Sequence, residues 1–177
     1  MNKYWKFIKA EKVYSDNVLD IERKTYFYGK INDSMPFTVI NTKDWAIIIP
    51  ELENGNFVMV KQFRVAANSV TIEFPGGALN KNEDKKEGAL RELREETGLK
   101  TENLKFLGTL MPNPAILSNS CYVYYAQKCK FAYDTNFDNF EDIEIIEMSK
   151  DDFKRSVKEG KISHSLVLSS YSLLLLN

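Results

Sequence analysis

The glutamates between residues 77 and 99 stand at spacings that place three carboxylates on one side of a helix. If residues 84–97 are helical, with ~100° between successive residues, Glu92, Glu95 and Glu96 fall within about 100° of arc. The side chains expected on the opposite side, facing a sheet, are those of Ala89, Leu90, Leu93 and Thr97. The pattern therefore predicts a helix with one acidic and one buried face, ended by Gly98 as its C′ residue.

Two further residues adapt the acidic face to a ligand. Gly88 lies one turn before Glu92 and leaves room there, and Arg91 stands four residues before Glu95, where it can pair with that carboxylate. Because like charges on one face repel each other, a bound hard cation is the simplest explanation for this arrangement. Carboxylate oxygens suit Mg²⁺ or Mn²⁺, and a cation held in this way suits a substrate that brings its own oxygens, such as a diphosphate.

The spacing of the whole segment is more specific than its acidity. A Glu-Glu pair alone is typical of a solvated helix face. Residues 77–99, however, read Gly77-x5-Glu83-x7-Arg91-Glu92-Leu93-Arg94-Glu95-Glu96-Thr97-Gly98-Leu99. This segment resembles the Nudix box, G-x5-E-x7-R-E-U-x-E-E-x-G-U, at every fixed position.

The resemblance implies a role for each matching residue. Glu92, Glu95 and Glu96 match the metal-binding carboxylates and are the expected catalytic residues, and the carbonyl of Gly76 matches a backbone metal ligand. Bound metal would neutralise phosphate oxygens and lower the pKa of a water molecule that attacks phosphorus in line. The positions that brace the loop and the helix are Gly77, Glu83 and Arg91.

The segments before the box indicate a branch of the family. Gln62-Phe63-Arg64 and Glu73-Phe74-Pro75-Gly76-Gly77 resemble the Gln-Tyr-Arg and Glu-Leu-Pro-Ala-Gly stretches of ADP-ribose pyrophosphatases. In that branch Arg64 would contact a phosphate, and Glu73 would lie beside the metal cluster or the substrate. The structural alternatives are a surface ion pair for Arg64 and a strand-end charge for Glu73.

A segment after the box leaves the identity of the substrate undecided. Asn113-Pro114-Ala115 and Ser118-Asn119-Ser120 resemble a loop of Nudix enzymes that act on nucleoside diphosphate sugars more broadly. The resemblance makes Asn113 a candidate substrate-binding residue. It also leaves substrates of the GDP-mannose and ADP-glucose type open.

The general base is the point where this chain departs from the branch. ADP-ribose pyrophosphatases often carry a catalytic glutamate in the loop before the last strand, and the matching position lies near Asn139, which cannot act as a base. Glu141 or Asp138 could substitute, or a glutamate of the box could serve, because a base needs only reach and a suitable pKa. A solvated loop carboxylate is the alternative for Glu141. His164, the only histidine, is expected to be structural.

The N-terminal segment offers partners for a nucleobase and for a second chain. A nucleobase needs an aromatic ring on which to stack. The candidates are Trp5, Tyr26, Phe27 and Tyr28, and packing in the core is the alternative for each of them. We take Tyr28 as the candidate binding residue. In the family this segment often reaches across a dimer, so residues 1–42 are a candidate dimerisation element of an expected homodimer.

The elements around the box predict an α+β chain with a mixed sheet. Residues 1–42 read as strands, and a turn at Asn54-Gly55 joins two others. Pro75–Gly77 and residues 130–140 are expected to be loops. Strands are expected at 18–28, 37–40, 45–49, 57–64, 70–74, 104–111, 120–127 and 143–146, and further helices at 149–160 and 163–176. The resemblance implies a Nudix α/β/α sandwich over residues 43–177, with residues 1–42 as a β appendage.

Whole-chain composition limits partners and location. The 24 basic and 25 acidic residues leave no general basic excess, so neither nucleic acid nor a membrane surface is an expected partner. Cys121 and Cys129 stand at the two ends of one strand-like run of roughly 26 Å, too far apart for a disulfide. Reduced thiols fit a cytoplasmic protein. The apolar run at 166–176 is shorter than the about 20 residues that cross a bilayer, and a docked helix is expected there.

Together these features predict a Mg²⁺-dependent hydrolase that splits ADP-ribose or a related nucleoside diphosphate sugar into a nucleoside monophosphate and a sugar phosphate. The alternatives are a broad or GDP-mannose-type nucleoside diphosphate sugar hydrolase, a housecleaning Nudix hydrolase of nucleoside triphosphates, and a non-catalytic module that binds a nucleotide sugar. The segments that flank the box argue against a hydrolase of nucleoside triphosphates. The complete set of box glutamates argues against the binding module.

Overall fold

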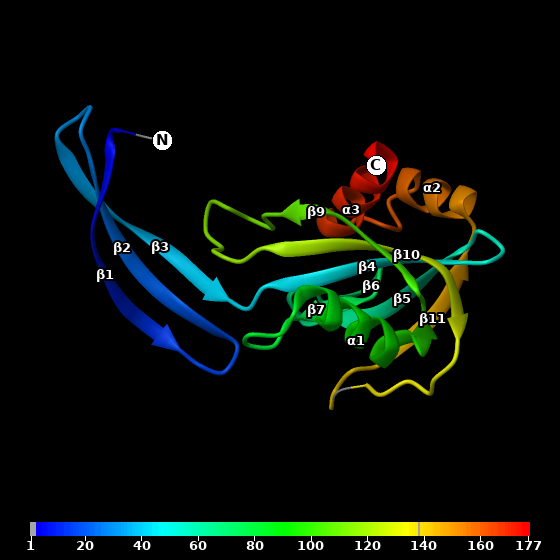
Figure 1. Cartoon of the computed structure of the whole chain (residues 1–177). Coiled ribbons are helices and arrows are strands. Elements are labelled where there is room, and N and C mark those ends of the chain that lie inside the picture. The colour runs from blue at the N-terminus through cyan, green and yellow to red at the C-terminus, as the bar shows by residue number, and fades with distance from the viewer. Residues whose placement is uncertain (1–2, 138) are drawn as a thin grey trace. The chain divides into compact units, whose positions relative to one another are not determined.

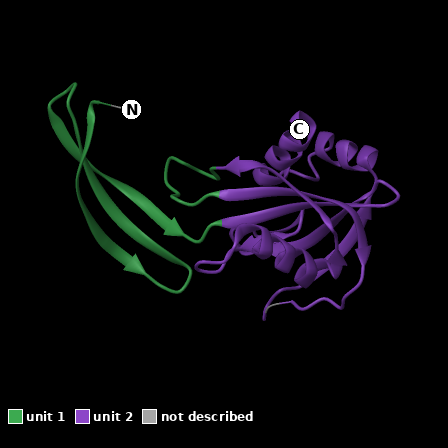
Figure 2. Ribbon diagram, in the orientation of Figure 1, with its two compact units in different colours: residues 1–44, 111–120 green, residues 45–110, 121–177 purple. Residues whose placement is uncertain are grey.

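The computed structural model describes residues 3–137 and 139–177, and the chain forms two compact units (Figures 1 and 2). Unit 1 comprises Met1–Asp44 and Met111–Ser120, and unit 2 comprises Trp45–Leu110 and Cys121–Asn177. The box therefore lies wholly in unit 2. The chain leaves unit 2 after Leu110 and returns to it at Cys121.

Unit 1 is a three-stranded antiparallel sheet in the order β1-β2-β3. Its strands are β1 (Trp5–Ser15), β2 (Leu19–Tyr28) and β3 (Asp33–Thr42). The turn between β1 and β2 is closed by the Asp16 carboxylate, which accepts the N–H groups of Val18 and Leu19 at 2.8 and 2.9 Å. The strands expected in the N-terminal segment are therefore present.

The second segment of unit 1, residues 111–120, is joined to β3 through its backbone. The N–H of Ile40 donates to the carbonyl of Ile116 at 2.8 Å, and the N–H of Ser118 donates to the carbonyl of Ile40 at 3.1 Å. The Asn113 carbonyl closes a turn by accepting the N–H groups of Ile116 and Leu117. Asn113 and Tyr28 consequently belong to the same unit.

Unit 2 contains a mixed sheet in the order β11-β5-β4-β10-β8, to which β6 adds beside β5, β7 beside β4 and β9 beside β10. The pairing of β4 with β10 is parallel, and the other pairings are antiparallel. The predicted α+β class is confirmed. The strands are β4 (Trp45–Leu52), β5 (Phe57–Arg64), β6 (Ser69–Glu73), β7 (Gly76–Ala78), β8 (Leu99–Lys100), β9 (Asn103–Leu110), β10 (Cys121–Phe131) and β11 (Ile143–Met148).

The helices cover both faces of this sheet. In Figure 1, α1 (Lys85–Thr97) lies on one face, and α2 (Lys150–Lys158) and α3 (Ser165–Leu176) lie on the other. The apolar run of β4 supplies both cores in alternation, because successive side chains of a strand point to opposite faces. Ile47 and Ile49 pack in the core that contains Phe153, and Ile48 packs in the core that contains Leu93.

Two predicted loops are partly wrong. The stretch expected as a loop at Pro75–Gly77 includes the start of β7, since Gly76 pairs with Ile47 so closely that a Cβ on Gly76 would lie 2.1 Å from the Ala46 carbonyl oxygen. The loop expected at 130–140 begins two residues later, because β10 continues to Phe131 by pairing with Leu99 of β8. Both differences arise from pairing between segments far apart in the chain.

Several local predictions are confirmed. Gly55 turns the β4–β5 connection with a φ of 85°, and Ser149 caps α2 by accepting the N–H of Asp152. Cys121 and Cys129 are both buried thiols that form no disulfide with each other. The apolar run at the C-terminus forms α3, and in the described part of the chain no helix is long and apolar enough to cross a membrane.

Candidate active site

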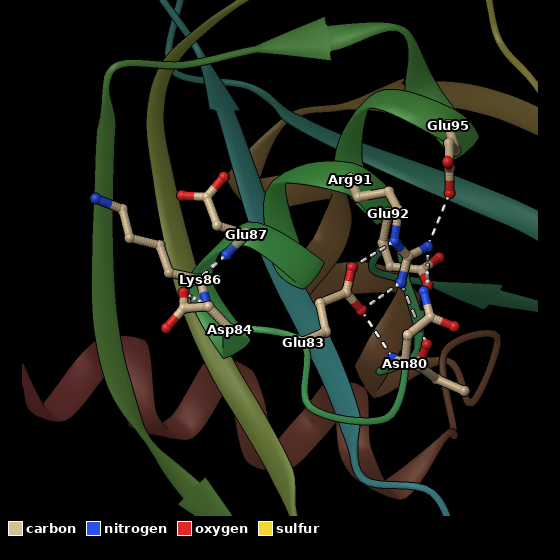
Figure 3. Close-up of polar contacts among 9 residues, drawn as sticks. Asn80, Glu83, Asp84, Lys86, Glu87, Arg91, Glu92 and Glu95 are labelled. Carbon is tan, nitrogen blue, oxygen red and sulfur yellow. Dashed lines mark hydrogen bonds and ion pairs between the residues drawn. The ribbon is translucent and has the colours of Figure 1, made fainter.

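The first turn and the last turn of α1 are fixed by their end residues. Before the helix, the Asp84 carboxylate accepts the N–H groups of Lys86 and Glu87 at 3.0 and 3.2 Å, which supplies partners for two N–H groups that a helix leaves open (Figure 3). At the other end Gly98 has a φ of 68° and donates its N–H to the Arg94 carbonyl. The predicted helix and its terminating glycine are confirmed.

Arg91 is the centre of an ion-pair network on the acidic face. Its guanidinium donates to both oxygens of Glu83 at 2.8 and 3.0 Å, and its Nη1 donates to Glu92 at 2.8 Å and to Glu95 at 2.9 Å (Figure 3). The N–H of Asn80 also donates to Glu83, at 2.8 Å. The bonds from Arg91, followed by that from Asn80, lower the pKa of Glu83 to about 2. Glu83 thus ties the loop before α1 to the middle of the helix.

Glu96 links α1 to β7 at a buried position. Its carboxylate accepts the N–H of Gly76 at 2.9 Å, and the residue is 5% exposed. Burial raises the pKa of Glu96 to about 8, and the charges of Glu92 and Glu141 act in the same direction. A buried carboxyl of this kind favours the neutral form unless a cation lies near it.

Glycines make room for the carboxylates. A Cβ on Gly77 would lie 2.6 Å from Oε2 of Glu92, so a side chain there would occupy the position of that carboxylate. A Cβ on Gly88 would lie 2.4 Å from Cδ2 of Leu79 and 3.0 Å from Oε2 of Glu83. The space beside Gly88, expected near Glu92, is therefore filled by Leu79 and Glu83.

Arg64 and Glu73 form a bidentate ion pair at the ends of paired strands. Arg64 Nε donates to Glu73 Oε1 at 2.8 Å, Nη2 donates to Oε2 at 2.6 Å, and the Thr71 hydroxyl donates to Oε1 at 2.5 Å. Burial alone would raise the pKa of Glu73, but the bonds from Arg64 and Thr71 lower it. The side chain of Arg64 remains 42% exposed. Its guanidinium can therefore meet a ligand while Glu73 fixes its plane.

Glu141 lies within electrostatic reach of these groups. Its charge contributes to raising the pKa of Arg64, Glu92 and Glu96, although burial is the largest cause for the two glutamates and the Glu73 bond for Arg64. The chain explains the proximity, because Ile143, two residues further on, pairs with Gln62, two residues before Arg64. Elements distant in sequence thus bring one guanidinium and several carboxylates within electrostatic reach of one another.

Comparison with known proteins identifies this arrangement. Residues 42–166, most of the chain, match the NUDIX domain family. The chain belongs to the NUDIX domain family. The glutamate helix and its flanking glycines, Gly77 and Gly98, are therefore parts of a Nudix box, and the protein is a Nudix hydrolase.

Individual relatives are similar over nearly the whole chain. A methanol dehydrogenase activator of Bacillus methanolicus is 30% identical over 161 residues, which cover 90% of this chain and 86% of the relative. An ADP-ribose pyrophosphatase of Bacillus subtilis (strain 168) is 26% identical over 160 residues, covering 89% and 85%. In fold, the chain is similar to an ADP compounds hydrolase of known structure, with a TM-score of 0.87, 18% identity and coverage of 98% and 94%. The Nudix fold predicted from the box is confirmed.

The residues predicted from the sequence divide between the two units. The Nudix box residues, Arg64, Glu73 and Glu141 all belong to unit 2, whereas Tyr28 and Asn113 belong to unit 1. Tyr28 stacks against Trp5, with ring centroids 4.4 Å apart and planes 17° from parallel. Asp138, considered as a base, lies outside the described residues.

The donor set of the Nudix box fits a hard divalent cation by its chemistry. Glu92, Glu95 and Glu96 offer carboxylate oxygens, the ligands that Mg²⁺ prefers, and glycine at position 77 leaves the Glu92 carboxylate its space. Among the described residues no group of three or more Asp, Glu, His or Cys side chains is already gathered as a metal site. The carboxylates instead accept hydrogen bonds from Arg91 and Gly76.

Three contributors to the site were missed from the sequence. They are Thr71, Asn80 and Asp84. Asp84 precedes the apolar periodicity of the helix and could have been found as an N-cap. Thr71 stands two residues before Glu73 on the same strand face, which period-2 reasoning could have found. The Asn80 backbone bond depends on loop conformation and carries no sequence signal.

Proposed function

We propose that this Nudix hydrolase cleaves the diphosphate of ADP-ribose or a related nucleoside diphosphate sugar, giving a nucleoside monophosphate and a sugar phosphate. The observation that carries the proposal is the electrostatic proximity of Arg64 to Glu96 and Glu141. An oriented, part-exposed guanidinium within electrostatic reach of Glu96, a carboxylate of the Nudix box, supports the proposal. A diphosphate needs both, because its oxygens pair with Arg and with a metal ion.

The proposed metal is Mg²⁺, with Mn²⁺ as an alternative. Glu92, Glu95, Glu96 and the carbonyl of Gly76 would hold it. When bound, the cation neutralises phosphate charge and lowers the pKa of a bound water. Arg91 orients the Glu92 and Glu95 carboxylates by donating to both.

The remaining residues of the site serve binding and proton transfer. Arg64 binds a phosphate oxygen while Glu73 fixes the guanidinium through two hydrogen bonds. Glu141 is the proposed general base, since its position after the loop brings its charge near the box. Tyr28 and Asn113, from unit 1, are the proposed contacts for the nucleobase and the sugar.

The names of the relatives support an ADP-based substrate. Two of the similar proteins are an ADP-ribose pyrophosphatase and an ADP compounds hydrolase, and both match most of this chain. The Asn113 loop keeps broader nucleoside diphosphate sugars, including those of the GDP-mannose type, as the nearest alternative. Hydrolysis of damaged nucleoside triphosphates is a more distant one.

A second candidate role is the activation of an alcohol dehydrogenase. The observation in its favour is the 30% identity to a methanol dehydrogenase activator over 90% of this chain. Adding the protein to a methanol dehydrogenase assay, with Glu96→Gln as the control, tests this role. Activation by the wild type alone would make hydrolysis part of the role, and no activation would exclude it.

We also propose a homodimer in which unit 1 is the dimerisation element, and a cytoplasmic location. Every residue of β1 is exposed, including Trp5 and Phe7, and an aromatic sheet face of this kind is typical of an interface. The two cysteines are buried thiols outside any disulfide, which fits a reducing compartment. Sedimentation of the whole chain beside a variant lacking residues 1–42 tests the dimer.

Product analysis tests the proposed reaction. The protein is incubated with Mg²⁺ and, separately, ADP-ribose, ADP-glucose, GDP-mannose, UDP-glucose or nucleoside triphosphates, and the nucleotides are separated by chromatography. Monophosphate from ADP-ribose alone supports the narrow assignment, and monophosphate from several sugars supports the broad one. Turnover of triphosphates alone would overturn both, and no turnover would revive the binding module.

A further inference from the structure

A short segment after β10 caps the C-terminal end of α1. The N–H groups of Ala132 and Tyr133 donate to the Gly98 carbonyl at 2.9 and 3.0 Å, and the N–H of Asn136 donates to the Glu95 carbonyl at 2.9 Å. The last carbonyl groups of a helix have no partners within it. Residues 132–136, the capping segment, supply such partners to the turn that carries Glu95 and Glu96.

A side-chain contact strengthens this cap. The guanidinium of Arg94, in the last turn of α1, lies over the ring of Tyr133, 5.7 Å from its centroid, which is within the range of a cation–π interaction. The backbones also meet closely, since a Cβ on Gly98 would lie 2.3 Å from the Tyr133 carbonyl oxygen. The capping segment is therefore pressed against the helix end by main chain and side chain together.

This contact is a property of this chain rather than of the box. Arg94 occupies the unspecified position of the Nudix box between Leu93 and Glu95. Arg94 and Tyr133 line an open hollow of about 860 Å³ together with Phe131, Ala132, Asp134 and Asn136. Phe131 lines the same hollow and is similarly exposed, at 60% against 53% for Tyr133. It offers a matched control for the ring of Tyr133.

We propose that Tyr133 is a positioning residue, whose ring holds Arg94 and thereby the last turn of α1, so that Glu95 and Glu96 present their carboxylates to a divalent cation. Glu95 accepts from Arg91 at 2.9 Å and Glu96 from Gly76 at 2.9 Å, so the orientation of both depends on where this turn lies. Tyr133 acts through the helix rather than on the substrate. The inference rests on the proposed function for the role of the carboxylates, whereas the cap itself is independent of it.

The test uses readouts other than turnover. Amide hydrogen exchange is measured over residues 94–98 and 132–136, and Mg²⁺ binding, with the metal alone, is measured by calorimetry. We expect Tyr133→Ala to speed exchange in both segments and to weaken Mg²⁺ binding about tenfold, the lower end of the loss seen when a group that orients metal ligands is removed. Tyr133→Phe, which keeps the ring, should restore both, and Phe131→Ala should change neither.

A second variant keeps the test valid if Tyr133→Ala fails to fold. Arg94→Gln removes the cation from an exposed side chain, and it should weaken Mg²⁺ binding as much as Tyr133→Ala. The double variant should be no weaker than either single one, because both remove the same contact. Additive losses, unchanged Mg²⁺ binding in Tyr133→Ala, or an equal loss in Phe131→Ala would each overturn the proposal.

The proposal and the proposed function fail in different ways. A wild-type protein that binds Mg²⁺ but hydrolyses none of the nucleotide sugars overturns the substrate assignment, while the exchange and calorimetry still decide the role of Tyr133. A wild-type protein that binds no Mg²⁺ overturns the positioning role itself.

Discussion

Nη1 of Arg91 lies 2.9 Å from Oε2 of Glu95, one turn further along α1. The same nitrogen lies 2.8 Å from Oε1 of Glu92. One guanidinium nitrogen therefore compensates two carboxylates that would otherwise repel each other. The acidic face of the helix is held in place from within, by a residue of the Nudix box.

Arg91→Lys should weaken both activity and the fold. Lysine keeps the charge but lacks the planar set of donors that reaches Glu83, Glu92 and Glu95 together. We expect turnover to fall about tenfold or more, and the free energy of unfolding in urea to fall by about 1–3 kcal/mol. Arg155→Lys is the matched control, since that arginine makes an exposed pair on α2 and should cost at most about 0.5 kcal/mol. Equal effects of the two variants would contradict the bracing role.

The stabilisation by Glu83 should be lost in acid. The pKa of Glu83 is about 2 in the folded chain, below its ordinary value of 4.5. The charged carboxylate therefore stabilises the fold fully above about pH 4.5, and this stabilisation disappears as the pH falls towards about 2. Urea denaturation of wild type and Glu83→Gln should differ most near neutral pH and converge in acid. A constant difference across this range, or the same pattern in the exposed Glu102→Gln, would rule the account out.

Glu96→Gln should separate activity from stability. The amide keeps the shape of the buried side chain but removes its charge, so turnover should fall at least about 100-fold. In the chelator-treated wild type, the pKa of Glu96 is about 8, above its ordinary value of 4.5. The free energy of unfolding therefore falls as the pH rises from 4.5 to about 8, because the folded chain holds this proton more tightly than the unfolded chain. The variant lacks this cost, and its advantage in the free energy of unfolding should grow over that pH range to more than about 1 kcal/mol.

Two outcomes would oppose this account of Glu96. Near-normal turnover with Mg²⁺ in Glu96→Gln would contradict the assignment of Glu96 to the metal site. A stability difference that does not change with pH would mean that burial does not raise the pKa of the Glu96 carboxyl. The exposed Glu102→Gln should alter neither quantity.

Phe153→Ala should strongly destabilise unit 2. Phe153 is fully buried on α2, and its ring is stacked on Phe74, with centroids 5.5 Å apart, and meets Phe57 edge-on. Loss of the ring leaves a cavity at the centre of this core, at a cost of about 3–5 kcal/mol in chemical denaturation. Phe106→Ala, at a ring that is 51% exposed, should cost much less. Similar losses for both would show that this core does not control stability.

Cys129 should resist alkylation in the native protein. It is buried and free, and burial raises the pKa of its thiol to about 11. Little thiolate is therefore present at about pH 8, and iodoacetamide should label it slowly, while the denatured chain labels completely. Mass spectrometry of labelled peptides measures both rates. Rapid labelling of native Cys129 would show that β10 opens readily around this residue.

The spacing of the Nudix box determined the most specific part of this protein from sequence alone. The helix, its acidic face, the Arg91–Glu95 ion pair and the terminating Gly98 were all predicted, because they depend on residues within one or two helical turns. The strand pattern was similarly available, since the apolar run of β4 is typical of a strand buried on both faces. Local periodicity and turn chemistry are encoded by neighbours in the chain.

Tertiary structure decided what depends on distant segments. The Gly76 N–H meets Glu96 across 20 residues, and the capping segment meets the end of α1 only after β10 has crossed the sheet. The extension of β10 to Phe131 and the strand β7 were missed for the same reason, since both are stabilised by pairing with remote strands. The sequence thus determined the donors of the site, whereas their distances, burial and pKa values follow from packing, because electrostatics and desolvation depend on separation in space rather than along the chain.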